Sequence, residues 1–348
     1  MAASPFRRAE AVRALTVASV RATSVLGGDD VVPEHVQVSV PPSEDSQPPD
    51  ASMPAFIQVD LSATRGAAFL RALRPTHWLK NVLVFAAPGA AGVLGRPEIL
   101  ARSCLAFVSM CFVASATYLV NDVVDAESDR RHPVRRRRAI ASGTLSERSA
   151  VFGSLVLFVV GIALSATLGG RFLAVVLVYI AVTISYSLWL QRIAVIDLVA
   201  VASGFVLRAI AGGAATHVAP SAWFLILTCS GALFVVAGKR LADEHTPTSD
   251  GSSTGRYPVS YLRGVWVLAG SVAITAYALW AFAVPHLVDG VAWSQVSIVP
   301  FAVALLRYAY VIELGDGGAP ERVFVHDRVL EAIVLVWLVT YALGVYLT

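Results

Sequence analysis

Residues 150–169 read AVFGSLVLFVVGIALSATLG, a run of twenty residues without a charged side chain. A helix needs about 20 mostly apolar residues to cross the hydrocarbon core of a bilayer. A membrane β-strand would alternate apolar and polar residues at every second position, and this stretch does not alternate. The segment therefore predicts a transmembrane α-helix.

This segment has apolar counterparts on both sides, which makes nine predicted spans. They cover roughly residues 80–97, 99–121, 150–169, 171–190, 194–215, 221–238, 262–285, 293–312 and 329–347. The first span is the weakest of the nine because Lys80 and Pro88 interrupt it. The predicted fold class is an all-α polytopic membrane protein with about nine transmembrane helices.

The composition supports this fold class and divides the chain in two. Of 348 residues, 56% are hydrophobic and 15% are charged, whereas soluble domains carry about 25% charged residues. These values exclude a soluble globular enzyme. Residues 1–65 are polar and include PPSEDSQPPD at 41–50, so we predict a disordered cytoplasmic tail. Residues 66–348 form the predicted membrane-embedded catalytic domain.

Basic residues predict the orientation in the membrane. With a cytoplasmic N-terminus, fifteen lysines and arginines fall on the cytoplasmic side of the nine spans and three fall outside. Loops rich in Lys and Arg stay in the cytoplasm. The sequence therefore predicts a plasma-membrane protein whose C-terminus lies outside the cell.

An acidic motif, YLVNDVVDAESD, ends the second predicted span at residues 118–129. Asn121, Asp125 and Asp129 are spaced by four residues and share one helix face with Tyr118, while Asp122 lies beside them. Clustered carboxylates repel one another unless a cation lies between them, and oxygen-only ligands favour Mg²⁺. A solvated helix end trimmed with aspartates is the alternative interpretation.

A basic run, RRHPVRRRR at residues 130–138, follows the acidic motif directly. Carboxylates that hold a metal, followed by guanidiniums that hold phosphate oxygens, are typical of a metal–diphosphate site. The run also serves as a topology signal and contacts anionic lipids. We expect both roles, with membrane lipid rather than nucleic acid as the partner.

The N-D-x-x-D-x-x-x-D pattern in a nine-span chain resembles the UbiA superfamily of intramembrane prenyltransferases. From about residue 70 onward, the sequence is more similar to the actinobacterial decaprenyl-phosphate phosphoribosyltransferases of that superfamily. This resemblance is carried by RPTHWLKN at 74–81, by the Asn121 motif with His132-Pro133, and by SGF and RAIAGG in residues 203–213. It continues in GKR at 238–240 and SIVPF at 297–301.

The resemblance implies transfer of 5-phosphoribosyl from 5-phosphoribosyl 1-diphosphate (PRPP) to a polyprenyl (decaprenyl) phosphate, for arabinan synthesis in the cell wall. It implies Mg²⁺ held by Asn121, Asp122, Asp125 and Asp129, with Asp122, Asp125 and Lys80 as the catalytic residues. The substrate-binding residues would be Lys80, Tyr118, Asn121, Arg135, Arg138, Tyr186, Arg192, Lys239 and Arg240. Homo-oligomerisation is left open.

Two polar residues in the fifth predicted span have open roles. Arg208 fits either a phosphate contact or a structural ion pair, and Asp197 fits either a metal or a cation contact. They lie eleven residues apart, so they share a face but are too distant to pair.

Two other functions compete with phosphoribosyl transfer. A UbiA-type prenyltransferase with a prenyl diphosphate donor predicts a second aspartate-rich motif, but Lys239 and Arg240 occupy its expected place. A transporter predicts inverted repeats with broken helices at the bilayer midplane. Here the charges cluster at the membrane interface instead.

Overall fold

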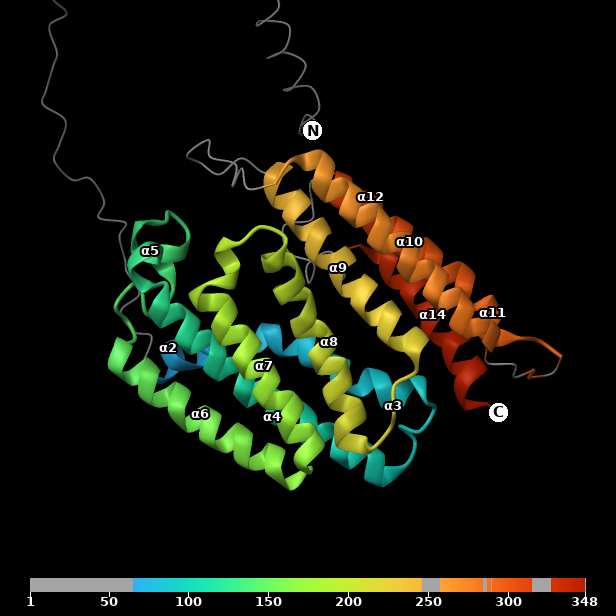
Figure 1. Ribbon diagram of the computed structural model, residues 1–348, viewed down its shortest axis with the longest axis horizontal. Coiled ribbons are helices and arrows are strands. Elements are labelled where there is room, and N and C mark those ends of the chain that lie inside the picture. Colours follow the sequence, from blue (N-terminus) through green and yellow to red (C-terminus); the bar gives the residue numbers. More distant parts are fainter. Residues whose placement is uncertain (1–64, 246–256, 284–286, 289, 315–326, 348) are drawn as a thin grey trace, which may run out of the picture. The chain divides into compact units, whose positions relative to one another are not determined.

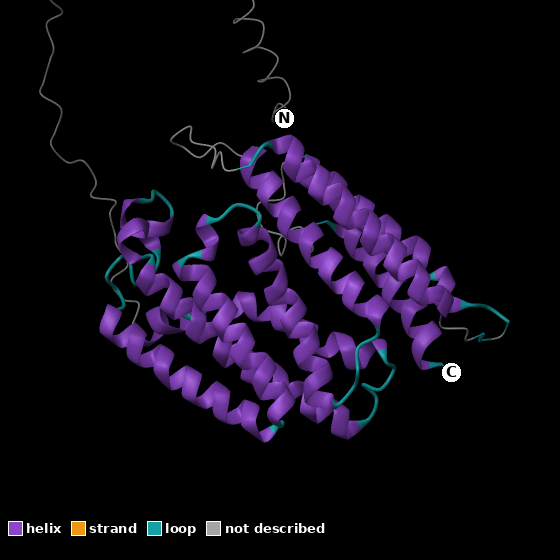
Figure 2. Cartoon of the chain, in the orientation of Figure 1, coloured by secondary structure: helices purple, strands orange, loops and turns teal. Residues whose placement is uncertain are grey.

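The computed structural model describes residues 65–245, 257–283, 287–288, 290–314 and 327–347. These residues belong to one unit, Asp60–Thr348, and the regular structure within them is helical (Figure 2). This confirms the all-α prediction. The predicted tail, residues 1–65, lies outside the described residues except for Arg65.

Eight helices of the described part are long and apolar enough to cross a membrane. One of them is built from the short helix α11 (Trp293–Val296) followed directly by α12 (Ile298–Glu313). The other seven are α4 (Pro97–Val124), α6 (Glu147–Thr167), α7 (Gly170–Leu188), α8 (Ile196–Thr216), α9 (Ala222–His245), α10 (Val259–Ala283) and α14 (Arg328–Tyr346).

The first predicted span, residues 80–97, does not form a long α-helix. The chain instead forms α2 (Arg65–Ala72), the 3₁₀-helix η1 (Pro75–Phe85) and the five-residue α3 (Ala86–Ala90). Arg74 adopts φ 53° between α2 and η1, and Pro75 starts the 3₁₀-helix. Eleven residues of 3₁₀-helix and five of α-helix extend over roughly 30 Å, so this region is still long enough to cross the hydrocarbon core.

The helix termini follow local sequence signals. Ser146 caps α6 by accepting a hydrogen bond from the Ser149 N–H, and Asp327 caps α14 through the N–H groups of Val329 and Leu330. Gly169 takes φ 110° in the tight turn between α6 and α7. The capping oxygens satisfy amide donors that the first helical turn leaves unpaired.

Figure 1 shows α4, α6, α7 and α8 side by side. A second group, α9, α10, α12 and α14, packs beside them, with α9 against α8. One apolar core unites η1, α4, α7 and α8, and another unites α8, α9, α10, α12 and α14. Helix α8 belongs to both cores. It therefore fixes the two groups of helices against each other.

The irregular η1 segment lies directly against α8. A Cβ atom on Gly212 would meet the carbonyl oxygen of Val84 at 1.8 Å, so no other residue fits at this crossing. Val84 is fully buried there. The close contact fixes the position of η1 along the axis of α8, and so the depth at which the η1 side chains lie in the bundle.

The outward faces of the long helices are apolar. Large side chains on them are more than half exposed, among them Phe152, Leu155, Leu268, Leu306 and Leu335. Soluble monomers rarely expose contiguous apolar patches of this extent. Together with the length of the helices, these faces identify an integral membrane protein.

Candidate functional site

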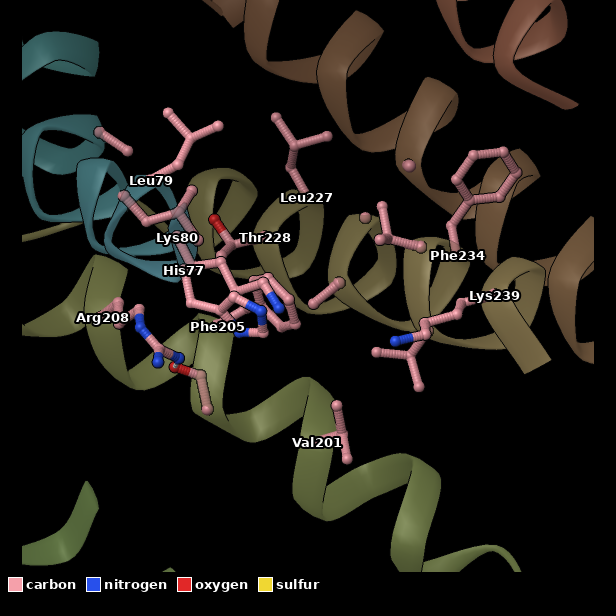
Figure 3. A pocket seen from close by; sticks show the side chains of 18 of the residues that line it. His77, Leu79, Lys80, Val201, Phe205, Arg208, Leu227, Thr228, Phe234 and Lys239 are labelled. Atoms are coloured by element: carbon pink, nitrogen blue, oxygen red, sulfur yellow. Dashed lines mark hydrogen bonds between the residues drawn. The ribbon is translucent and has the colours of Figure 1, made fainter. Parts of the chain in front are cut away.

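A cavity of about 1070 Å³ lies among η1, α4, α7, α8, α9, α10, α12 and α14. Its polar end lies where α4, α7 and α9 end, and Figure 3 shows Lys80 and Lys239 among the side chains that line it. The other end is formed mainly by apolar and aromatic side chains, including Phe224, Leu227, Trp280, Phe301 and Trp337. From Phe224 to Arg240, α9 extends over about 24 Å, so the cavity is long as well as large.

The cavity brings seven of the twelve predicted site residues together. These are Lys80, Tyr118, Asn121, Arg135, Tyr186, Lys239 and Arg240. They come from η1, α4, α7, α9 and the short 3₁₀-helix η2 (Arg135–Arg137), which are distant in the sequence. Five predicted residues are not among the lining side chains, namely Asp122, Asp125, Asp129, Arg138 and Arg192.

Asn121 and Asp125 are joined at the end of α4. Asn121 Nδ2 donates to Asp125 Oδ2 at 3.0 Å, as their i, i+4 spacing predicts. Ser187, at the end of α7, donates its hydroxyl to Asn121 Oδ1 at 2.8 Å. The amide of Asn121 therefore lines the cavity in a fixed orientation, with the Asp125 carboxylate beside it.

Asp122 and Asp129 form an ion-pair cluster with two arginines. Asp122 Oδ1 lies 2.5 Å from Arg74 Nη2 and 3.3 Å from Arg138 Nη1, and the same Arg138 nitrogen lies 2.6 Å from Asp129 Oδ2. Both aspartates are buried. Through Arg74 and Arg138, the cluster attaches two segments to the end of α4: the turn between α2 and η1, and the turn after η2. These contacts form one rim of the polar end.

The burial of Asp125 and the nearby charge of Asp129 raise the pKa of Asp125 above its ordinary value. The hydrogen bond from Asn121 and the positive charges of Arg138 and Arg135 oppose this shift. Burial and a neighbouring carboxylate therefore both disfavour the ionised form of Asp125. A divalent cation beside Asp125 would favour the ionised form.

Mg²⁺ fits the donor set when a phosphorylated substrate accompanies it. In the described part of the chain, no three His, Cys, Asp or Glu residues converge closely enough to hold a metal ion. Mg²⁺ usually binds one or two carboxylates and completes its shell with water and substrate phosphates. The Asp125 carboxylate and the amide oxygen of Asn121 supply such a partial set.

At the polar end of the cavity, the buried carboxylate of Asp197 forms an ion pair with Arg240. Arg240 Nη2 lies 3.2 Å from Asp197 Oδ2, and Tyr257 donates its hydroxyl to the other oxygen of Asp197. Asp197 therefore contacts a cation, one of the two roles that the sequence left open. Arg192, at the end of the 3₁₀-helix η3 (Leu190–Arg192), is exposed outside the cavity lining.

Other residues lie at the cavity although they were not predicted as site residues. Arg74, His77, Ser187 and Asp243 all line the cavity, and Tyr257 positions Asp197. The HxxK spacing of His77 and Lys80 was a signal available in the sequence, because residues three apart share one face of a 3₁₀-helix. Tyr257 lies two residues before α10 begins at Val259, and no local pattern marks it.

The fold matches a solved UbiA homolog from Archaeoglobus fulgidus that is bound to GPP and Mg²⁺. The TM-score is 0.62 at 17% identity, and the match covers 80% of this chain and 98% of that one. At this identity, the likeness shows the shared fold.

Sequence comparisons agree with the fold. A curated decaprenyl-phosphate phosphoribosyltransferase from Corynebacterium glutamicum is 42% identical over 287 residues, which cover 80% of this chain and 86% of that relative. Its counterpart from Mycobacterium tuberculosis is 41% identical, with 80% and 94% covered. The profile of the UbiA prenyltransferase family matches residues 82–341. The chain therefore belongs to the UbiA prenyltransferase family.

Proposed function

We propose that this protein transfers 5-phosphoribosyl from PRPP to a polyprenyl phosphate such as decaprenyl phosphate and releases diphosphate. The observation that carries the proposal is the cavity itself, which joins a polar, cation-rich end to a long apolar end. A charged sugar donor and a lipid acceptor need these two environments in one site. The names of the curated relatives support the same reaction.

The chemistry follows from the donor. The bond between ribose C1 and the diphosphate oxygen breaks towards an oxocarbenium-like state, as in other glycosyl transfers. Lys80 and Arg135 line the polar end and would neutralise the departing diphosphate, while Asn121 and Asp125 would hold Mg²⁺. When bound, Mg²⁺ supplies Lewis-acid stabilisation of the leaving group.

The nucleophile is a phosphate oxygen of the acceptor lipid. It is already an anion, so the new C1–O bond forms without removal of a proton by a general base. One C–O bond forms, one breaks, and the electron pair leaves with the diphosphate. Catalysis then consists of positioning two anions and neutralising charge in a site enclosed by helices.

The proposed donor side faces the cytoplasm of a plasma-membrane protein. PRPP is a highly charged cytosolic metabolite, and its charged groups do not cross hydrocarbon unaided. The ends of α4, α7 and α9, where the polar side chains gather, are the ends that the distribution of Lys and Arg predicts to be cytoplasmic. The product would supply arabinan synthesis.

A prenyl diphosphate donor is the competing proposal. It is favoured by the structural likeness to a UbiA homolog that binds GPP. PRPP carries a phosphate on C5 besides its diphosphate, and Lys239 and Arg240 at the end of α9 provide cations for a second phosphate group. The α9 end contributes Asp243 as a cavity-lining carboxylate rather than an aspartate-rich cluster.

Two measurements on the purified protein test the proposal. With radiolabelled PRPP, decaprenyl phosphate and Mg²⁺, we expect a lipid-extractable labelled product and stoichiometric diphosphate. Isothermal titration should detect PRPP binding, and Lys239→Gln should weaken it. Tight binding of geranylgeranyl diphosphate with none of PRPP would reverse the choice of donor.

A further inference from the structure

Arg208 is a buried cation in the middle of α8. Its side chain lines the cavity, as Figure 3 shows, and the residue is 5% exposed. It lies twelve residues after Ile196, the first residue of α8, which corresponds to about 18 Å along the helix. A charged residue at such depth in a membrane bundle is costly and marks a functional site by default.

Among the described residues, the hydrogen-bond partners of Arg208 are all neutral. Nε donates to Asn81 Oδ1, Nη1 to the Gly204 carbonyl and Nη2 to the Tyr179 hydroxyl, each at 2.7 Å. The guanidinium also lies 4.8 Å from the ring centroid of Tyr179 and 5.9 Å from that of Phe205. None of the carboxylates in the described ranges lies within ion-pair distance of it.

This arrangement holds the guanidinium in place without neutralising it. A guanidinium has five N–H donors, and within the described part of the chain Asn81, Gly204 and Tyr179 use three of them. Two donors and a full positive charge therefore remain on a side chain that borders the cavity. A buried cation is stabilised by an anion that accepts its hydrogen bonds. Two oxygens of one phosphate can accept two parallel N–H bonds from a guanidinium.

Arg208 lies at the junction between the two ends of the cavity. Its partner Asn81 directly follows Lys80, which belongs to the polar end. Its neighbour Ala209 packs with Ala87 and Phe224 in the apolar core at the other end. An anion at Arg208 would therefore lie between a donor at Lys80 and a chain that extends into the apolar end.

We propose that Arg208 binds the phosphate of the acceptor lipid and positions its oxygen towards the donor. This proposal deepens the proposed function and rests on it, because the acceptor phosphate is the group that must lie between the ribose and the lipid chain. The 5-phosphate of PRPP is the competing source of the same chemistry. Kinetics and binding separate the two.

Arg208→Gln is the test variant and Arg102→Gln is its matched control. Arg102 is likewise held by hydrogen bonds, to the carbonyls of Ala215 and Leu168 and the ring of His217, but it does not line the cavity. We expect Arg208→Gln to raise KM for decaprenyl phosphate by roughly 10- to 100-fold, as loss of charged hydrogen bonds implies. KM for PRPP should stay within about twofold, and Arg102→Gln should change neither KM.

A binding measurement in the absence of PRPP tests the role of Arg208 independently of the proposed transfer reaction. Decaprenyl phosphate should raise the unfolding temperature of the wild type more than decaprenol does, and Arg208→Gln should lose that difference. If PRPP proves not to be the donor, this result still tests Arg208. If Arg208→Gln does not fold, Arg208→Lys keeps the charge but loses the fork and should raise the lipid KM severalfold.

Three results would overturn the assignment. A raised KM for PRPP with an unchanged lipid KM would assign Arg208 to the donor. Wild-type KM values in both Arg208→Gln and Arg208→Lys would make it structural. Equal stabilisation of the wild type by decaprenyl phosphate and decaprenol would remove the phosphate site.

Discussion

Arg138 forms a 2.6 Å ion pair with Asp129, and the same Arg138 nitrogen lies 3.3 Å from Asp122. The acidic motif is therefore divided between two tasks. Asp122 and Asp129 pair with arginines, whereas Asp125 is joined to Asn121 at the cavity wall. This division leads to opposite expectations for variants only three residues apart.

Asp122→Asn should lower the stability of the protein. Asp122 is 4% exposed and pairs with both Arg74 and Arg138, so its loss removes the carboxylate that Arg74 contacts, whereas Arg138 keeps Asp129. We expect a loss of about 2 kcal/mol in the free energy of unfolding, read as a lower unfolding temperature in detergent. Unchanged stability with abolished transfer would assign Asp122 to the metal instead.

Asp125→Asn should abolish transfer while the fold is kept. An amide occupies the same space and still accepts a hydrogen bond from Asn121, but it lacks the charge that binds Mg²⁺. We expect turnover to fall at least about 100-fold. The control is Glu127→Gln on the neighbouring helix α5 (Ala126–Arg131), because Glu127 pairs only with exposed arginines. Undiminished turnover in EDTA would contradict the metal site.

Stability at low pH should depend on Asp327, which caps α14. Its backbone hydrogen bond from Leu330 and the neighbouring Arg307 hold the pKa of Asp327 below its ordinary value. The stabilisation is therefore complete above the pKa of the unfolded chain and is lost as the pH falls through the lowered folded pKa. Asp327→Asn should lower the unfolding temperature at neutral pH and lessen its fall in acid. Parallel pH profiles of variant and wild type would contradict this.

The long helices were predictable because apolar runs alone determine them. The 80–97 segment was predictable only in part: Lys80 and Pro88 mark it as the weakest span, but no local signal predicts its close contact with Gly212, more than 120 residues away. Likewise, the i, i+4 spacing predicts the pairing of Asn121 with Asp125, but nothing local predicts that Arg138 pairs with Asp129. Side-chain partners across the bundle, such as Asn81 for Arg208, depend on packing between helices that the sequence does not specify locally.

Residues 1–61, most of the predicted tail (residues 1–65), should be dispensable for catalysis. They lie outside the described residues, and their polar composition provides too few apolar side chains for a core of their own. A chain that begins at Ser62 should keep the specific activity of the full-length protein in detergent. Lost activity in a shortened chain with an unchanged unfolding temperature would show that the tail contributes to the site or to an oligomer.

The polar end of the cavity should face the cytoplasm, and cysteine labelling tests this. Ser142 is exposed in the connection between α5 and α6, on the side that fifteen of the eighteen counted basic residues predict to be cytoplasmic. Thr167 is exposed at the opposite end of α6 and serves as the matched control. Cys104 and Cys229 are exposed as well, so both are first replaced by alanine. In this background, Ser142→Cys should resist a membrane-impermeant maleimide in intact cells and react in inside-out vesicles, whereas Thr167→Cys should behave in the opposite way. Labelling of Ser142→Cys in intact cells would invert the topology and place the polar end where cytosolic PRPP has no access.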